Sequence, residues 1–271
     1  MGLVTKVNSQ TAYSVSNVLC RFLRSRGLAV AYTGEIDLDG ERVLSVDRMN
    51  ADLIVVVGGD GTVLRTAQLS GKTPILGVNV GALGYLCETT PESALEALEK
   101  VLAGRFYLDY KTKLTVNYKD LTFPDVLNET LVATSKPSRI LSLMILKDGE
   151  PVHRGKADGI IISTTTGSTA YALSAGGSII DPQVDVLEAV FICPLSAGLR
   201  PLIFPCSSKI EIKVLPGAAS GIVVLDGQTV QEVDYDVPIT VKRSEHQAAF
   251  ARINPPEFYE RIRGKIKGLE I

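Results

Sequence analysis

The first hundred residues alternate short, continuously apolar runs with patterns typical of amphipathic helices. Apolar runs stand at 28–32, 53–57 and 74–80, while residues 10–23 and 62–69 carry apolar side chains at three- and four-residue spacing. A run without polar alternation is buried on both faces, as in a parallel sheet covered by helices. The pattern therefore predicts a parallel α/β domain at the start of the chain.

The sequence pattern changes after about residue 104, from alternating strands and helices to mostly strands. Short strand-like runs broken by Gly, Asp or Pro follow one another, and the Asp-Gly within 147–150 is typical of a β-hairpin. The expected fold class is α/β plus all-β: an N-terminal Rossmann-like parallel α/β domain, a β-sandwich-type domain, and a C-terminal helix, with its pattern at 255–263, that returns to the first domain. The expected bounds are 1–103, 104–252 and 253–271. No linker separates the two domains, so a cleft between them is the expected ligand site.

Composition narrows the possible functions. The 271 residues are 45% hydrophobic with a formal net charge of −2, which gives no overall electrostatic case for nucleic acid or an anionic membrane. The N-terminus is too polar for a signal peptide, and no apolar run approaches the roughly 18 residues of a transmembrane helix. We expect a cytoplasmic protein with no zinc site and with four reduced thiols, since no CxxC pair is present. These are Cys20, Cys87, Cys193 and Cys206.

The stretch GGDGT, residues 58–62, lies where an apolar strand ends and a helix begins. Ligands of open α/β sheets bind at such ends. Glycines let backbone amides approach phosphate oxygens, and the helix N-terminus favours negative charge. Neither GxGxxG nor the P-loop pattern is present. The predicted phosphate-binding residues are Gly58, Gly59, Gly61 and Thr62.

Asp60 is unexpected in a loop that binds phosphate. An acid at this point suits a residue that accepts a proton from an attacking hydroxyl, or that helps to hold Mg²⁺ against a triphosphate. The alternative is a helix N-cap, a common use of Asp. Two glycines before the acid and one after it exceed what a cap needs, which favours a catalytic role.

Two later clusters carry polar groups suited to a nucleotide. Asn128-Glu129 can bond ribose hydroxyls or adenine edges, although a surface turn is a common alternative for such a pair. Residues 156–182, KADGIIISTTTGSTAYALSAGGSIIDP, combine a strand with a loop dense in hydroxyls and amides. That loop suits a ligand with adenine and sugar edges, and Tyr171 can border a ring.

Together these motifs resemble the NAD kinase family over most of the chain. GGDGT alone is shared with the diacylglycerol and sphingosine kinases and, in variant form, with the phosphofructokinases. The resemblance adds GVNVGALGYL, the Asn-Glu pair, DGIIISTTTGSTAY, SAGG, LRPLIFP, LDGQ and EFYERIRGKI. Three positions depart from the family pattern. Thr165 and Ser178 replace prolines, and Ala82 replaces a larger, often basic residue.

The resemblance implies phosphoryl transfer from ATP, or from polyphosphate, to the 2′-hydroxyl of the adenosine ribose of NAD, giving NADP. It also implies Mg²⁺ or another divalent cation and a homodimer or homotetramer. Asp60 becomes the candidate base or hydroxyl-orienting carboxylate. Asp158 matches an acid that reaches the nicotinamide side, often across a subunit boundary. Arg154 and Lys156 are the nearest basic residues for the NAD phosphates, or else ordinary edge-strand charges. The implied NAD-binding residues are Tyr85, Asn128, Glu129, Lys156, Asp158, Thr166, Ser168, Thr169, Ala170, Tyr171, Ser174 and Gln228.

Two other functions remain open from the residues. A lipid or sugar kinase could share the GGDGT loop, and an NAD(P)-binding sensor could lack transfer activity. The sequence does not choose between ATP and polyphosphate, between NAD and NADH, or between oligomeric states. It also identifies no metal ligands and no effector site.

Overall fold

The computed structural model describes residues 1–33, 38, 40–43, 45–81, 84–136, 138–217, 219–255 and 258–267. It divides into two compact units, Met1–Lys111 with Ala248–Ile271, and Thr112–Gln247. Both boundaries fall inside long strands, β6 (Tyr107–Tyr118) and β17 (Ile239–Arg252). A strand that continues across a boundary carries no turn residue, so the sequence holds no local mark of these positions.

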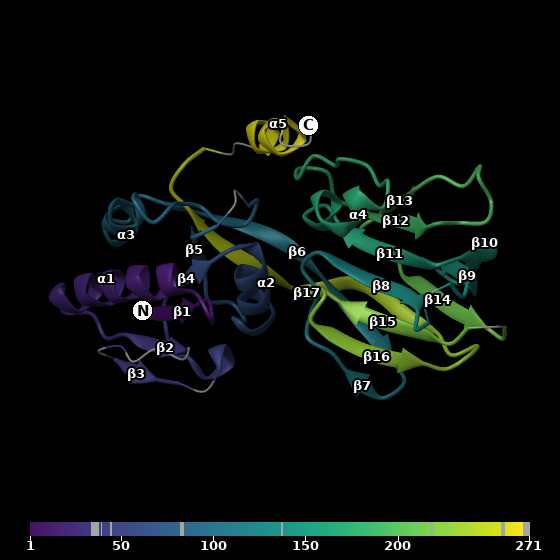
Figure 1. Ribbon diagram of the computed structural model, residues 1–271, viewed down its shortest axis with the longest axis horizontal. Coiled ribbons are helices and arrows are strands. Elements are labelled where there is room, and N and C mark those ends of the chain that lie inside the picture. Colours follow the sequence, from purple (N-terminus) through teal and green to yellow (C-terminus); the bar gives the residue numbers. More distant parts are fainter. Residues whose placement is uncertain are drawn as a thin grey trace. The chain divides into compact units, whose positions relative to one another are not determined.

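The first unit contains a parallel sheet in the order β3-β2-β1-β4-β5-β17. The chain winds from β1 to β2 on one side of the sheet order and from β4 to β5 on the other, so the direction reverses between β1 and β4 (Figure 1). Such a reversal is where open α/β sheets bind ligands. The GGDGT loop directly follows β4. The elements are β1 (Gly2–Thr5), α1 (Gln10–Ser25), β2 (Ala31–Thr33), β3 (Glu41–Arg42), the 3₁₀ turn η1 (Val46–Arg48), β4 (Ile54–Gly58), α2 (Asp60–Leu69), β5 (Ile75–Asn79) and α3 (Ala94–Leu102).

One core packs α1 and α3 against the sheet, and it confirms the expected α/β arrangement. Some apolar side chains of these helices face away from the core. Val18 on α1 is exposed, as are Leu95 and Leu102 on α3. The buried face of α3 is instead built from Ala94, Ala97, Leu98 and Val101. This face packs on α1 as well as on the sheet.

The second unit is a β-sandwich, as expected. One sheet has the order β10-β9-β14-β17 with β6 and β7 attached, and the other has the order β13-β12-β11-β8-β15-β16. Side chains from both sheets form a single core. The hairpin predicted at 147–150 joins β9 to β10, with Asp148 and Gly149 at φ of 53° and 89°. The elements are β7 (Leu121–Thr122), β8 (Glu129–Thr134), β9 (Leu141–Lys147), β10 (Glu150–Ala157), β11 (Gly159–Thr164), η2 (Gly167–Thr169), α4 (Tyr171–Ser174), β12 (Val186–Ile192), β13 (Leu202–Pro205), β14 (Ile210–Leu215), β15 (Gly221–Leu225) and β16 (Thr229–Val233).

The C-terminal helix α5 (Phe258–Lys267) belongs to the first unit, which confirms its expected return. It begins after the predicted start at 255; residues 256–257 and 268–271 of the expected segment lie outside the described residues. Within the described ranges, no helix is both long and apolar enough to cross a membrane. All four cysteines are free thiols, and three of them are buried, Cys193 being exposed.

Candidate functional site

The loop between β4 and α2 leaves part of its backbone uncovered. A Cβ on Gly58 would lie 2.5 Å from the Thr62 hydroxyl oxygen, so packing itself requires glycine there. A Cβ on Gly61 would meet no described atom within 4 Å, and one on Gly59 would meet only the Asn79 side-chain oxygen at 3.9 Å. Neither packing nor a left-handed backbone requires glycine at 59 and 61. Both glycines therefore leave open space at the N-terminus of α2, where an anion is favoured.

The Asp60 carboxylate is held by a second loop. Its Oδ2 accepts the backbone N–H of Tyr85 at 2.7 Å, and its Oδ1 accepts that of Leu86 at 3.0 Å. A Cβ on Gly84 would lie 2.1 Å from Oδ1, so only glycine allows this approach. The helix N-cap is Gly59, with no side-chain cap, and Asp60 is the first helical residue. The structure thus excludes the N-cap explanation of the acid and gives its carboxylate two backbone donors.

The Tyr85 phenol and the Cys87 thiol are not alternative bases to Asp60. Burial, reinforced by the Asp60 carboxylate, raises the pKa of the Tyr85 phenol, and the same two causes raise the pKa of the Cys87 thiol to about 12. Both groups therefore stay protonated at neutral pH. A cavity of about 290 Å³ adjoins Cys87. It is lined by Asn79, Gly84, Cys87, Glu88, Thr89, Thr90, Glu260 and Arg261.

Asn79 is a site residue that the sequence analysis did not single out. It ends β5 opposite Gly58 at the same edge of the sheet, and its amide group exchanges hydrogen bonds with the backbone of Gly81 at 3.2 and 3.3 Å. Its position at the end of a parallel strand was the available signal. Ala82, one of the departures from the family pattern, lies outside the described residues.

In the second unit, one buried carboxylate orients the Asn-Glu pair. Asp226 accepts three consecutive backbone N–H groups, those of Leu127 at 2.8 Å, Asn128 at 2.8 Å and Glu129 at 3.1 Å. Asp226 is buried and adopts a φ of 48° in the turn between β15 and β16. The family resemblance includes LDGQ and implies Gln228 as the NAD-binding residue of this turn, where its side chain is exposed. The Asp-Gly turn between two strands was the signal for Asp226.

Glu129 presents a buried carboxyl oxygen with unused bonding capacity. Its Oε2 has no hydrogen-bond partner among the described residues. Burial, together with the nearby Asp226 carboxylate, raises the pKa of Glu129 to about 7. A buried polar atom without a partner costs about 1–3 kcal/mol. The side chain is therefore suited to exchange a hydrogen bond with a ligand hydroxyl or amino group.

The TGSTAY loop is brought against Asn128. The backbone N–H of Thr164 donates to the Asn128 carbonyl at 2.9 Å, and the Thr164 hydroxyl donates to the Leu127 carbonyl at 2.7 Å. A Cβ on Gly167 would lie 2.1 Å from the Asn128 carbonyl oxygen, so this glycine is required for the close approach. The Asn-Glu pair and the loop, 38 residues apart from Asn128 to Thr166, form one cluster through β8 and β11.

Within that loop, the predicted residues differ in exposure. Ser168 and Thr169 are buried, and their hydroxyls donate to the carbonyls of Thr165 and Thr166 at 2.8 and 3.3 Å. These two hydroxyls hold the loop's own shape. Groups that remain at least partly accessible belong to Thr166, Ala170, Tyr171 and Ser174.

Asp158 and Lys156 are not brought to the Asn-Glu cluster of their own unit. In the pairing of β11 with β8, Ser163 stands opposite Glu129, whereas Gly159 stands opposite Ala133. Asp158 precedes Gly159 and lies five residues before Ser163. Because an extended strand rises about 3.3 Å per residue, Asp158 and Ser163 are roughly 16 Å apart. Lys156 is exposed on β10. The two residues lie at the opposite end of β11.

Ser178, which replaces a family proline, has a bond that proline could not make. Its backbone N–H donates to Glu188 Oε1 at 2.6 Å. Glu188 is fully buried, and its other oxygen, Oε2, has no partner in the described part of the chain. Proline lacks the N–H. The segment after α4 is therefore anchored to β12 by this residue.

Two family models match the chain: the ATP-NAD kinase N-terminal domain over residues 1–106 and the ATP-NAD kinase C-terminal domain over residues 127–253. An NAD kinase of Methanothermobacter thermautotrophicus is 37% identical over 272 residues, covering 98% of this chain and 95% of that protein. An NAD kinase of Thermococcus kodakarensis is 36% identical over 275 residues, covering 98% of each.

Solved structures agree with these matches. An NAD kinase from Archaeoglobus fulgidus in complex with ATP has a TM-score of 0.82 at 28% identity, covering 99% of this chain and 100% of that one. Yeast NADH kinase complexed with NADH has the same fold, with a TM-score of 0.87 at 24% identity, over 100% of this chain and 89% of that one.

Proposed function

The chain belongs to the ATP-NAD kinase family, and we propose that it transfers the γ-phosphoryl group of ATP to the 2′-hydroxyl of the adenosine ribose of NAD, giving NADP. The observation that carries the chemistry is the Asp60 carboxylate, held by two backbone amides beside uncovered glycines at a helix N-terminus. Phosphoryl transfer needs positioning and charge stabilisation more than covalent chemistry.

We propose the following roles in the first unit. Gly58, Gly59, Gly61 and Thr62 frame the donor phosphates, whose charge is favoured by the N-terminus of α2. The ribose O2′ attacks the γ-phosphorus as its bond to the β,γ-bridging oxygen breaks and ADP leaves. Asp60 orients the 2′-hydroxyl and accepts its proton.

Mg²⁺ fits this arrangement. The described residues contain no group of three His, Cys, Asp or Glu side chains able to hold a metal ion. Mg²⁺ commonly binds through one or two carboxylates, substrate phosphates and retained water rather than an all-protein cage. The Asp60 oxygens, each with lone-pair capacity beyond its single amide bond, could supply the protein's share. When bound, the cation would neutralise charge on the β- and γ-phosphates.

We propose that NAD contacts the cluster around Asn128 and Glu129. The unsatisfied Glu129 oxygen suits a sugar hydroxyl or an adenine amino group. Ser168 and Thr169 are assigned to NAD as well, although their hydroxyls also hold the loop. The other proposed contacts are Tyr85, Lys156, Asp158, Thr166, Ala170, Tyr171, Ser174 and Gln228.

The place of Asp158 and Lys156 supports a homodimer or homotetramer. Both lie at the far end of β11 from the Asn-Glu cluster, so we propose that they complete the site of a neighbouring subunit. A cytoplasmic location is proposed because none of the four cysteines forms a disulfide.

The test is to incubate the purified chain with ATP, Mg²⁺ and NAD and to measure NADP. Parallel reactions with polyphosphate and with NADH determine the donor and acceptor preference. Asp60→Asn should keep NAD binding and lose turnover by about a hundredfold or more, since a positioned base contributes that much. Tight NADP binding without turnover would favour a sensor. Transfer to a diacylglycerol or to fructose 6-phosphate, but not to NAD, would favour the other kinases.

A further inference from the structure

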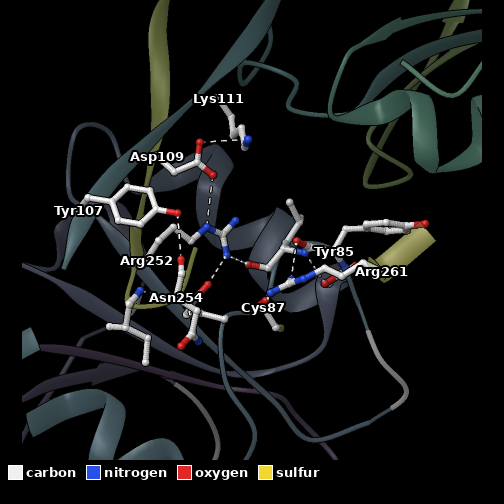
Figure 2. A network of polar contacts seen from close by, with 12 residues as sticks. Tyr85, Cys87, Tyr107, Asp109, Lys111, Arg252, Asn254 and Arg261 are labelled. Carbon is white, nitrogen blue, oxygen red and sulfur yellow. Dashed lines mark hydrogen bonds and ion pairs between the residues drawn. The ribbon is translucent and has the colours of Figure 1, made fainter. Parts of the chain in front are cut away.

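The backbone of Tyr85–Cys87 is hydrogen-bonded through both its N–H and its carbonyl groups, the carbonyls accepting from Arg252 and Arg261 (Figure 2). On one side, the N–H groups of Tyr85 and Leu86 donate to the Asp60 carboxylate. On the other side, three consecutive carbonyls accept from arginines. Arg261 Nη1 donates to the carbonyls of Tyr85 at 3.2 Å and Cys87 at 2.7 Å, and Arg252 Nη1 donates to that of Leu86 at 3.0 Å. The segment therefore connects the carboxylate to two cations.

One peptide group makes this connection directly. The carbonyl of Tyr85 accepts from Arg261, and the N–H of the same peptide group, that of Leu86, donates to Asp60 Oδ1. Both hydrogen bonds involve an ionised side chain, which makes them stronger than neutral ones. A bond at one end of a peptide group also polarises the group toward the bond at its other end. Arg261 thus strengthens and orients a donor to Asp60 without touching it.

Arg252 holds the same segment from the interior. It is buried, as is its partner Glu88, and Arg252 Nη1 lies 3.2 Å from Glu88 Oε2. Arg252 Nε also pairs with Asp109 at 3.3 Å. Glu88 Oε1 accepts the backbone N–H groups of Ile253 and Asn254 at 2.9 and 3.0 Å. Removing one member of a buried ion pair is strongly destabilising, so Arg252 and Glu88 form the structural frame of the segment.

Arg261 is different, because it is only partly buried and lies on the short terminal helix α5. We propose that Arg261 is a positioning residue for Asp60, acting through the backbone of Tyr85–Cys87. The inference rests on the proposed role of Asp60 in transfer. It makes the orientation of the reacting carboxylate depend on the docking of the C-terminal helix, some 200 residues later in the chain.

The test compares Arg261→Gln with Arg261→Lys and with Arg263→Gln. Arg263 lies on the same helix, is 67% exposed and pairs, among the described residues, with Glu260 at 4.0 Å, so it is the matched control. Arg261→Gln removes the charge-assisted bonds to the carbonyls of Tyr85 and Cys87. It should lower kcat about tenfold, with KM for ATP and NAD within about twofold of the parent. Arg261→Lys should recover part of kcat, since an ammonium can still donate to a carbonyl.

Backbone hydrogen exchange provides a readout that does not depend on turnover. The amides of Tyr85 and Leu86 should exchange faster in Arg261→Gln than in the parent or in Arg263→Gln, while the melting temperature stays close to that of the control. Unchanged kcat, a rise in KM alone, or unchanged exchange of these two amides would overturn the inference. Full turnover by Asp60→Asn would overturn the proposed role of Asp60 and this inference with it. An inactive Asp60→Asn beside a fully active Arg261→Gln would overturn this inference alone.

Discussion

At the scale of single residues, Glu129 gives the fold a dependence on pH. Its pKa is raised from 4.5 to about 7 by burial and by Asp226, so the folded state binds this proton more tightly than the unfolded chain. The stability that it contributes is complete below about pH 4.5 and is lost as pH rises through about 7. At high pH the ionised carboxylate therefore lowers the free energy of unfolding, whereas a neutral amide of similar shape would not.

Glu129→Gln should consequently gain stability relative to the parent as pH increases from 5 to 8. The expected difference at pH 8 is on the order of 1–3 kcal/mol, since one pKa unit corresponds to about 1.4 kcal/mol. Urea unfolding at a series of pH values measures it. Parallel stability curves for the two proteins would contradict the buried, ionisable environment of Glu129.

Ser178 allows a second prediction at this scale. Restoring the family residue by Ser178→Pro removes the N–H bonded to Glu188 at 2.6 Å, and Glu188 already has one oxygen without a partner. Although proline stiffens a loop, losing the donor should dominate and lower the free energy of unfolding by about 1–3 kcal/mol. Ser178→Ala, which keeps the N–H but loses the hydroxyl that also bonds to Glu188, is the control and should lose less stability than Ser178→Pro. An unfolding free energy that rises in Ser178→Pro would show that stiffening outweighs the lost bond.

At the scale of elements, the sequence pattern predicted those helices, strands and turns that depend on residues close together in the chain. The apolar runs, the glycine turn before α2 and the hairpin at 147–150 all depend on sequence spacing of a few residues. Asp226 and Asn79 were not singled out because their roles arise only when distant strands are paired. Ser168 and Thr169 were expected to face the ligand because the loop is rich in hydroxyl groups. Composition alone does not reveal that these two hydroxyls also donate to carbonyls of their own loop.

The N-terminus of α2 separates glycines needed for packing from glycines left open for a ligand. Gly61→Ala should fold with unchanged or slightly higher stability, by up to about 1 kcal/mol, because a helix favours alanine. Its methyl group enters the open space beside the proposed phosphates, so KM for ATP should rise about tenfold. Gly58→Ala places a Cβ 2.5 Å from Thr62 and should lose about 1–3 kcal/mol. Thermal melts and ATP titrations measure both. Equal effects of the two substitutions would contradict the distinction.

At the scale of the whole molecule, the antiparallel pairing of β11 with β8 separates Asp158 from the Asn-Glu cluster of its own chain. The sequence distance between Asp158 and the TGSTAY loop is short, although the family resemblance implies that Asp158 often acts across a subunit boundary. An extended strand converts that short sequence distance into a long spatial one. We propose that Asp158 contributes to NAD binding in the site of another subunit, which would make activity a property of the oligomer.

This arrangement predicts complementation between inactive subunits. Asp60→Asn and Asp158→Asn should each have little activity alone. In a mixed dimer one site carries both substitutions, whereas the other has an intact Asp60 from one chain and an intact Asp158 from its partner. Random mixing makes about half of the dimers mixed and half of their sites intact, so activity should return to about a quarter of the parent. Subunits are exchanged by dilute denaturant and refolding, and NADP formation is followed. Activity no greater than the sum of the separate variants, in dimers shown to be mixed by a mass tag, would mean that Asp158 acts within its own chain or does not act at all.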